Sequence, residues 1–203
     1  MKKIFYTFLV ILLLVLCLIF FLPKKEKNDN MNSIKIAEVT HSVFYAPLYV
    51  AIEEGYFNEE NIDIKLILTP GADKVSAAVL SGDVQIGFAG AESAIYVYEK
   101  KEKDYLQIFS GLTKRDGQFI LGRKDKKDFS LKDLYGKEIL VGRSSGMPAL
   151  NFLNALKNEE IDKNKIKINY NIDFASLSGA FIGNTGDYVN LFEPTALKLE
   201  KEG

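Results

Sequence analysis

Three short segments hold the residues of this sequence best suited to binding a small solute. The first, residues 40–45, follows a predicted strand and precedes a predicted helix. In it Ser42 can donate a hydrogen bond, and Phe44 and Tyr45 can stack on an aromatic ring. A simple turn with its aromatic side chains in the core is the alternative interpretation.

The other two segments place glycine and hydroxyl residues where a strand gives way to a helix. Gly90, Ala91 and Glu92 begin one helix, whose free backbone N–H groups could hold a ligand oxygen, although Glu92 would repel a bare anion. The third segment, residues 142–147, follows a predicted strand and precedes a predicted helix. Its spacing matches neither a dinucleotide fingerprint nor a P-loop, so we do not expect nucleotide hydrolysis. The simpler alternative is helix capping for the segment at Gly90 and a flexible strand-to-helix turn for residues 142–147. The candidate donors of the third segment are Ser144, Ser145, Gly146 and Met147.

Catalytic and metal chemistry find little support in the residue types. His41 has no Ser, Cys or Asp partner at a spacing typical of nucleophilic catalysis. Asp173, Asp187 and Glu193 fall near predicted strand ends, but the sequence alone does not pair them for acid–base work. The single cysteine, Cys17, lies in an apolar run, which excludes a disulfide scaffold and the usual Cys/His metal sites. We therefore expect neither a metal nor a cofactor.

The charge balance argues against nucleic acid as a partner. The chain has 26 basic and 27 acidic residues and a net charge of −1. Lysines outnumber acids in the first 27 residues, so the remainder is more acidic than the whole. Phosphate binding requires a basic surface instead.

The N-terminus resembles an export segment. Residues 4–22 are apolar except for Thr7, and as a helix they would nearly cross the hydrocarbon core of a bilayer. An uncleaved anchor is favoured over a lipoprotein modified at Cys17 or a cleaved signal, because both of these need small residues that the sequence lacks. We assign residues 1–27 to an export signal or membrane anchor and residues 28–33 to a tether.

Predicted strands and helices alternate through the rest of the chain, which indicates an α/β fold with parallel sheets covered on both faces. A charged segment at 123–128 resembles a linker, so we expect two lobes, 34–122 and 123–203. The expected strands are 34–39, 62–68, 84–89, 105–112, 119–122, 138–141, 165–170 and 188–192. The expected helices are 47–56, 72–80, 91–103, 130–134, 148–157, 175–182 and 194–202.

Four motifs occur in an order that resembles one family. Residues 46–57 (APLYVAIEEGYF) resemble the "AP-x-x-VA-x-E-x-G-Y/F-F" opening of nitrate/sulfonate/taurine-type solute-binding proteins. Residues 80–87 resemble "L-x-x-G-x-x-D-I-G", with Gln85 in place of the usual Asp. Residues 134–139 and 186–194 resemble "L-x-GK-x-I" and "G-x-x-D-x-x-x-x-x-EP". These proteins are extracytoplasmic receptors of ATP-binding-cassette (ABC) importers, and the group includes receptors for thiamine-pyrimidine precursors.

The resemblance implies a periplasmic-binding-protein-like fold of type II, with two doubly wound lobes preceded here by an N-terminal hydrophobic helix. A small-molecule ligand would lie between the lobes and pass to an ABC permease with its ATPase subunit, at the extracytoplasmic face of the membrane. The implied ligand-binding residues are Ser42, Phe44, Tyr45, Gly90, Ala91, Glu92, Ser144, Ser145, Gly146, Met147 and Glu193. Glu193 belongs to the "EP" motif, which recurs across substrates, so it could also orient the backbone.

Solute binding without catalysis is the favoured function. An enzyme of the same fold, similar to the thiamine-pyrimidine synthases, is an alternative, but those enzymes lack an export segment and carry a Cys-rich motif. A membrane-anchored sensor domain is another. For the substrate, a sulfonate would use the donors at 144–147 and Arg143. An aminated heteroaromatic would use Phe44, Tyr45, Glu92 and Glu193, and is slightly preferred.

The family pattern also creates an expectation about chain length. Its members usually continue beyond the "EP" helix and return to complete the first lobe. We therefore expect that a chain ending at residue 203 is truncated at its C-terminus and binds only weakly by itself.

Overall fold

The structure is a computed structural model that describes residues 31–101, 103–114 and 117–202. The predicted export segment and most of the tether lie outside these residues. Within them, no helix combines the length and apolar character that a membrane span requires.

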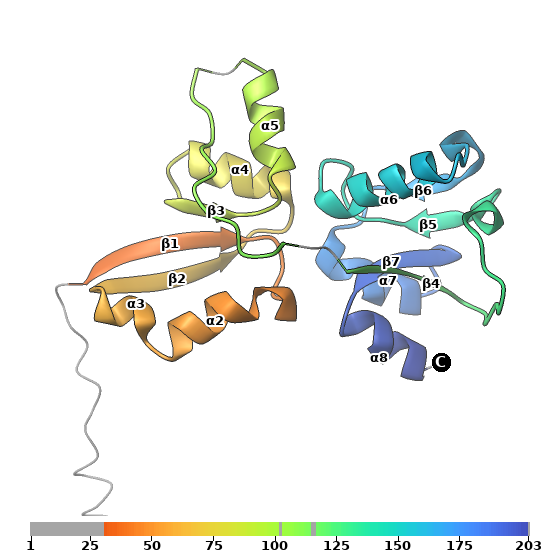
Figure 1. The fold of residues 1–203 in the computed structure, drawn as a ribbon, viewed down its shortest axis with the longest axis horizontal. Coiled ribbons are helices and arrows are strands. Elements are labelled where there is room, and N and C mark those ends of the chain that lie inside the picture. The colour runs from red at the N-terminus through yellow and green to blue at the C-terminus, as the bar shows by residue number, and fades with distance from the viewer. Residues whose placement is uncertain (1–30, 102, 115–116, 203) are drawn as a thin grey trace, which may run out of the picture. The chain divides into compact units, whose positions relative to one another are not determined.

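The first sheet has three parallel strands in the order β2-β1-β3. They are β1 (Asn32–Glu38), β2 (Ile62–Leu68) and β3 (Ile86–Phe88). Asn32 pairs with Ile62 and Glu38 with Leu68, so β1 and β2 end at the same edge. In Figure 1, helices cover both faces of this sheet. The helices are α2 (Ala46–Glu53) and α3 (Tyr56–Glu59) on one face, and α4 (Ala72–Leu80) and α5 (Glu92–Glu99) on the other.

The second sheet has four strands in the order β4-β7-β5-β6. They are β4 (Gln118–Gly122), β5 (Glu138–Leu140), β6 (Lys167–Asn169) and β7 (Tyr188–Phe192). This sheet is mixed rather than fully parallel, because β4 runs antiparallel to β7. Its helices are α6 (Met147–Asn158), α7 (Leu177–Ile182) and α8 (Thr195–Glu202), with α6 on the face opposite α7 and α8 (Figure 1). Among the described residues, the short 3-10 turns are η1 (Val43–Tyr45), η2 (Leu131–Leu134), η3 (Lys163–Lys165) and η4 (Phe174–Ser176).

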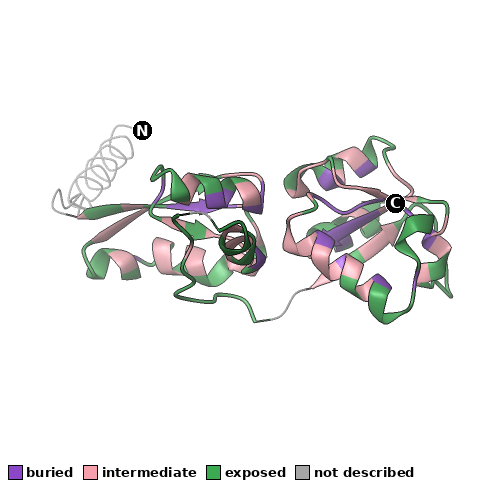
Figure 2. Cartoon of the chain, turned by 90° about the horizontal axis from the view of Figure 1, so that it is seen from above, coloured by how far each residue is buried: buried purple, intermediate pink, exposed green. Residues whose placement is uncertain are grey.

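The hydrophobic core is concentrated around the second sheet. Ile139 and Leu140 are neighbours in β5, and because side chains alternate along a strand they belong to clusters on opposite faces. One cluster packs Phe152 and Leu156 of α6, and the other packs Leu177 of α7. Around the first sheet the buried cluster is smaller and consists of Ala37, Val75 and Val84. In Figure 2 the buried residues follow the strands of both sheets, while the outer helix faces are exposed.

Most predicted elements are confirmed, and β2, α4 and β7 have the predicted bounds. Three expectations are wrong. The predicted strand at 105–112 is irregular chain with Ile108 and Phe109 exposed, and among the described residues it pairs with no strand. The strand predicted at 119–122 in the first lobe belongs to the second sheet as β4. Asn32 and Ser33, predicted in the tether, belong to β1.

Arg123, placed by the sequence in a charged linker, anchors the end of α7. Its guanidinium donates from Nε to the carbonyl oxygen of Gly186 at 2.8 Å and from Nη2 to that of Phe181 at 2.8 Å. It also donates to the carbonyl oxygen of Thr185 at 3.0 Å and lies 4.1 Å from the Phe181 ring centroid. The last carbonyls of a helix lack intrahelical partners, and a cation suits that end.

We expect Arg123→Ala to lower the free energy of unfolding by about 1–2 kcal/mol, because several charge-assisted hydrogen bonds are lost at a partly exposed site. Urea unfolding of the full chain measures the change. The exposed neighbour Lys124 provides a control of equal charge, and Lys124→Ala should change stability little. Equal effects of the two substitutions would contradict the anchoring role.

Candidate functional site

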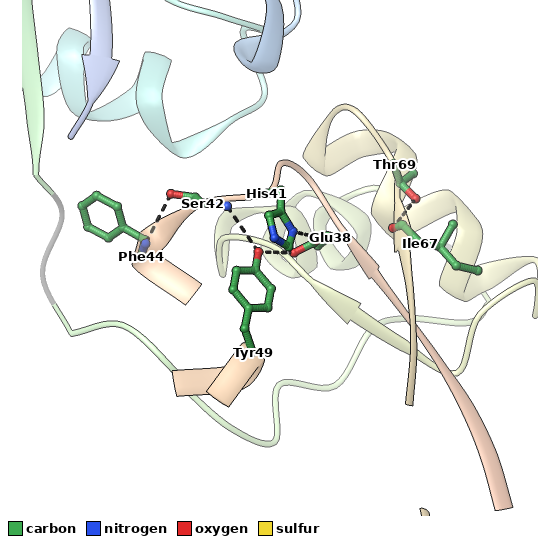
Figure 3. Close-up of polar contacts among 7 residues, drawn as sticks. All are labelled: Glu38, His41, Ser42, Phe44, Tyr49, Ile67 and Thr69. Carbon is green, nitrogen blue, oxygen red and sulfur yellow. Dashed lines mark hydrogen bonds and ion pairs between the residues drawn. The ribbon is translucent and has the colours of Figure 1, made fainter. Parts of the chain in front are cut away.

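A buried carboxylate at the end of β1 organises the loop that follows it. Glu38 is 3% exposed. The Tyr49 hydroxyl donates to its Oε2 at 2.6 Å, and the Ser42 backbone N–H donates to Tyr49 Oη at 3.2 Å. His41 Nδ1 lies 3.1 Å from Glu38 Oε1, and the His41 ring stacks on that of Tyr49 with centroids 4.2 Å apart (Figure 3). Burial and the Glu38 hydrogen bond raise the pKa of Tyr49 above its usual range, so its hydroxyl keeps its proton.

This loop forms one wall of a pocket of about 460 Å³. The opposite wall comes from η4, the start of α7, and the end of β7 with the residues that follow it. Of the predicted ligand-binding residues, Ser42 and Glu193 line the pocket. The remaining lining residues were not among the predicted ones. They are Thr40, His41, Val43, Ala46, Tyr49, Val50, Phe174, Ala175, Ser178, Leu191, Phe192, Pro194 and Thr195.

Phe44 and Tyr45, predicted to stack on a solute, instead support this pocket from behind its lining. Phe44 packs on Phe192, with ring centroids 4.9 Å apart, and Phe174 packs on Phe192 at 4.6 Å. Tyr45 contacts the ring of Phe88 edge-on at 4.3 Å. The aromatic contacts between Phe44, Phe192 and Phe174 therefore connect the two walls.

The structure brings the second and third predicted segments together, away from this pocket. Glu92, 6% exposed in the first turn of α5, directs its carboxylate toward the backbone at Met147, the first residue of α6. Burial raises the pKa of Glu92, and the N–H groups of Glu92 and Met147 only partly oppose the rise, since neither oxygen makes a well-formed hydrogen bond. A Cβ at Gly90 would overlap this carboxylate, so a larger residue there would displace the Glu92 side chain. Ala91, Ser144, Ser145 and Gly146 flank the contact in sequence and do not line the pocket.

Arg143, the predicted cation for a sulfonate, is held by two carboxylates. Its Nε and Nη2 donate to Asp73 at 2.9 and 2.5 Å, and Nη1 lies 3.6 Å from Asp173 Oδ1. Desolvation raises the pKa of Asp73, but the hydrogen bonds and charge of Arg143 outweigh it and leave that pKa below its usual range. The positive charge of Arg143 is therefore already neutralised within the protein.

Glu193 has a backbone role as well as a place in the pocket lining. Its Oε2 accepts a hydrogen bond from the N–H of Leu197 at 2.8 Å, which caps the first turn of α8. This contact supports the structural role that the "EP" motif left open. Within the part of the chain that the structure describes, no group of three or more His, Cys, Asp and Glu residues could hold a metal ion.

Comparison with known proteins gives one family and one fold. The family described as "NMT1/THI5 like" matches residues 43–202. YtlA of Bacillus subtilis (strain 168), provisionally named as a binding protein, is 42% identical over 187 residues, which are 92% of this chain and 56% of YtlA. The chain thus spans little more than half of this relative.

Solved structures of binding proteins share the fold at low identity. The periplasmic aliphatic sulphonate binding protein SsuA of Escherichia coli matches with a TM-score of 0.62 and 14% identity, over 85% of this chain and 58% of SsuA. The alkanesulfonate-binding SsuA of Xanthomonas axonopodis pv. citri, bound to MOPS, matches with a TM-score of 0.61 and 17% identity. The match covers 84% of this chain and 58% of that SsuA. A ligand-binding component of an ABC-type import system from Staphylococcus aureus, with zinc bound, matches with a TM-score of 0.63 and 16% identity. The match covers 85% of this chain and 58% of that protein. These relatives are binding proteins rather than enzymes.

The buried Glu92 makes stability depend on pH. Its pKa in the folded chain is raised above that in the unfolded chain, so the folded state holds the Glu92 proton more tightly. The associated stability is fully present below the unfolded pKa and is lost as the pH rises through the folded pKa. We expect Glu92→Gln to be more stable than the wild type at neutral pH, with the difference vanishing in acid. Urea unfolding over a pH series measures this.

Glu99→Gln provides the control, because Glu99 is an exposed carboxylate on the same helix. It should show no comparable pH-dependent gain. Destabilisation by Glu92→Gln at neutral pH would show instead that the contact with the start of α6 outweighs the desolvation.

Proposed function

Because the chain belongs to the NMT1/THI5-like family, we propose that it is the solute-binding component of an ABC importer. In this proposal it captures a small organic solute between two lobes, one built on each sheet, and delivers it to a permease and its ATPase subunit. The E. coli relative, which shares the fold, is a periplasmic binding protein. Binding draws its free energy from enclosure of the solute and closure of the lobes, and it needs no bond-making chemistry.

The observation that carries this proposal is the aromatic-lined pocket. Its volume of about 460 Å³ lies within the range of sites that enclose small organic ligands, roughly 300–1,000 Å³. Tyr49, Phe174 and Phe192 supply apolar ring surface, and Ser42 and Glu193 supply a small number of polar groups. That combination is typical of a site that encloses a planar organic solute and orients it with a few hydrogen bonds.

An aminated heteroaromatic suits this pocket better than a sulfonate, taurine or nitrate. None of the lining residues is Lys or Arg, and Glu193 adds a negative charge. Arg143, the predicted cation for an oxyanion, is already bound by Asp73 and Asp173. An anionic group would therefore lose its hydration without gaining an ionic partner from the lining. The SsuA proteins that bind sulfonates share the fold of this chain at 14–17% identity, and their ligands do not transfer at that level.

The proposed location is the extracytoplasmic face of the membrane. The apolar run at residues 4–22 would serve as the anchor, and the lipoprotein alternative at Cys17 lacks the small residues before the cysteine. The permease would then receive the solute from a receptor held close to the membrane surface.

A thermal-shift panel with aminopyrimidines, taurine, alkanesulfonates and nitrate tests the proposed function and substrate. At about 100 times its Kd, a ligand stabilises the folded state by about 2.7 kcal/mol, which raises the Tm of a domain of this size by roughly 5–10 °C. We expect such a shift with an aminopyrimidine and none with the sulfonates.

Two variants localise the effect. Phe192→Ala removes a pocket wall and should abolish the ligand-induced shift, whereas Phe129→Ala removes a ring that packs on Tyr188 outside the pocket and should preserve it. A shift with sulfonates that disappears in Arg143→Ala would reverse the substrate assignment. The absence of any ligand-induced shift would count against the solute-binding function.

A further inference from the structure

The protons around Glu38 can be assigned from the hydrogen-bond directions. The backbone N–H of Ser42 can only donate, so Tyr49 Oη is its acceptor. The single proton of the Tyr49 hydroxyl is then directed to Glu38 Oε2, 2.6 Å away. Glu38 Oε2 is therefore the acceptor in this contact.

The same carboxylate fixes the proton of His41. With Glu38 ionised, the carboxylate can only accept, and His41 Nδ1, 3.1 Å from Glu38 Oε1, is then the protonated nitrogen of this contact. In a neutral imidazole the other nitrogen, Nε2, then carries a lone pair and is a hydrogen-bond acceptor. Stacking on Tyr49, with 18° between the ring planes, holds the orientation of the His41 ring.

Glu38 and Tyr49 are packed behind the imidazole, but His41 itself faces outward. Its side chain is 72% exposed and belongs to the pocket lining. The network thus places an acceptor of fixed orientation on the wall of a solute-sized pocket. The carboxylate that fixes it is the 3% exposed Glu38.

We propose that His41 is a ligand-contacting specificity residue, whose Nε2 is locked as an acceptor by Glu38 and selects solutes that present an N–H donor. The inference rests on the proposed solute-binding function and assigns a polar contact within that pocket. An amino group on the solute can donate a hydrogen bond to the lone pair of Nε2. A sulfonate or nitrate oxygen meets it as a second acceptor, which leaves both groups unpaired and disfavours binding.

The first test is a ¹⁵N spectrum of the full chain labelled at histidine. Because the sequence contains one histidine, the two imidazole nitrogens give an unambiguous pair of signals. We expect a protonated Nδ1 and an unprotonated Nε2 in the neutral ring. Tyr49→Phe, which removes one donor to Glu38, should shift the populations of the two tautomers. A wild-type spectrum with the proton on Nε2 would overturn the proposal.

The second test compares two solutes by calorimetry, an aminopyrimidine and its isostere in which a methyl group replaces the amino group. We expect the wild type to prefer the amino compound by about tenfold, the scale of one hydrogen bond. His41→Asn retains an amide donor that can reach Glu38 but lacks Nε2. It should lose about tenfold in affinity for the amino compound and little for the methyl compound.

Thr69→Ala is the matched control, because Thr69 bonds to the carbonyl oxygen of Ile67 and is outside the pocket lining (Figure 3). It should leave both affinities unchanged. If His41→Asn keeps the wild-type preference, the contact assigned to His41 is wrong although the solute-binding function stands. If neither pyrimidine binds the wild type, the proposed function itself fails.

Discussion

The site depends on the need to satisfy one buried carboxylate. Glu38 ends a parallel strand in a position with 3% exposure, where an ionised group without partners would be strongly destabilising. Two side chains meet that need, Tyr49 from α2 and His41 from the connecting loop. Satisfying Glu38 therefore fixes the rotation of α2 and the path of the loop, and these two elements form the wall of the pocket.

A second set of charges joins elements that belong to different sheets. Arg143 precedes α6 of the second sheet, whereas Asp73 lies in the first turn of α4 beside the first sheet. Together with the contact between Phe44 and Phe192, this ion pair joins elements built on different sheets. The pair is only partly buried, so its contribution to stability is modest. In the proposed function, the same pair also engages a cation that an oxyanion ligand would otherwise use.

The sequence predicted the elements better than the site. Alternating apolar residues and the breaks at Pro70 and Gly71 placed β2 and α4 correctly, because these signals are local. The segment at 105–112 has strand-like composition, yet pairing depends on a neighbour that local patterns do not reveal. The same limit applies to the pocket lining, which includes the predicted Ser42 but also His41 and Tyr49, which were not predicted. Their importance comes from a shared partner, Glu38, that the fold brings to them.

Burial is distributed unevenly between the two sheets, and this has a dynamic consequence. The first sheet encloses a cluster of three buried apolar residues, whereas the second is packed on both faces. Amide protons of β1 and β3 should therefore exchange with solvent through local openings that cost less free energy than those of β5 and β7. Since β1 also carries Glu38, a solute bound on the His41 and Tyr49 wall, as the proposed function has it, would stabilise the strand beneath it. Affinity and the local rigidity of the first sheet are thus thermodynamically linked.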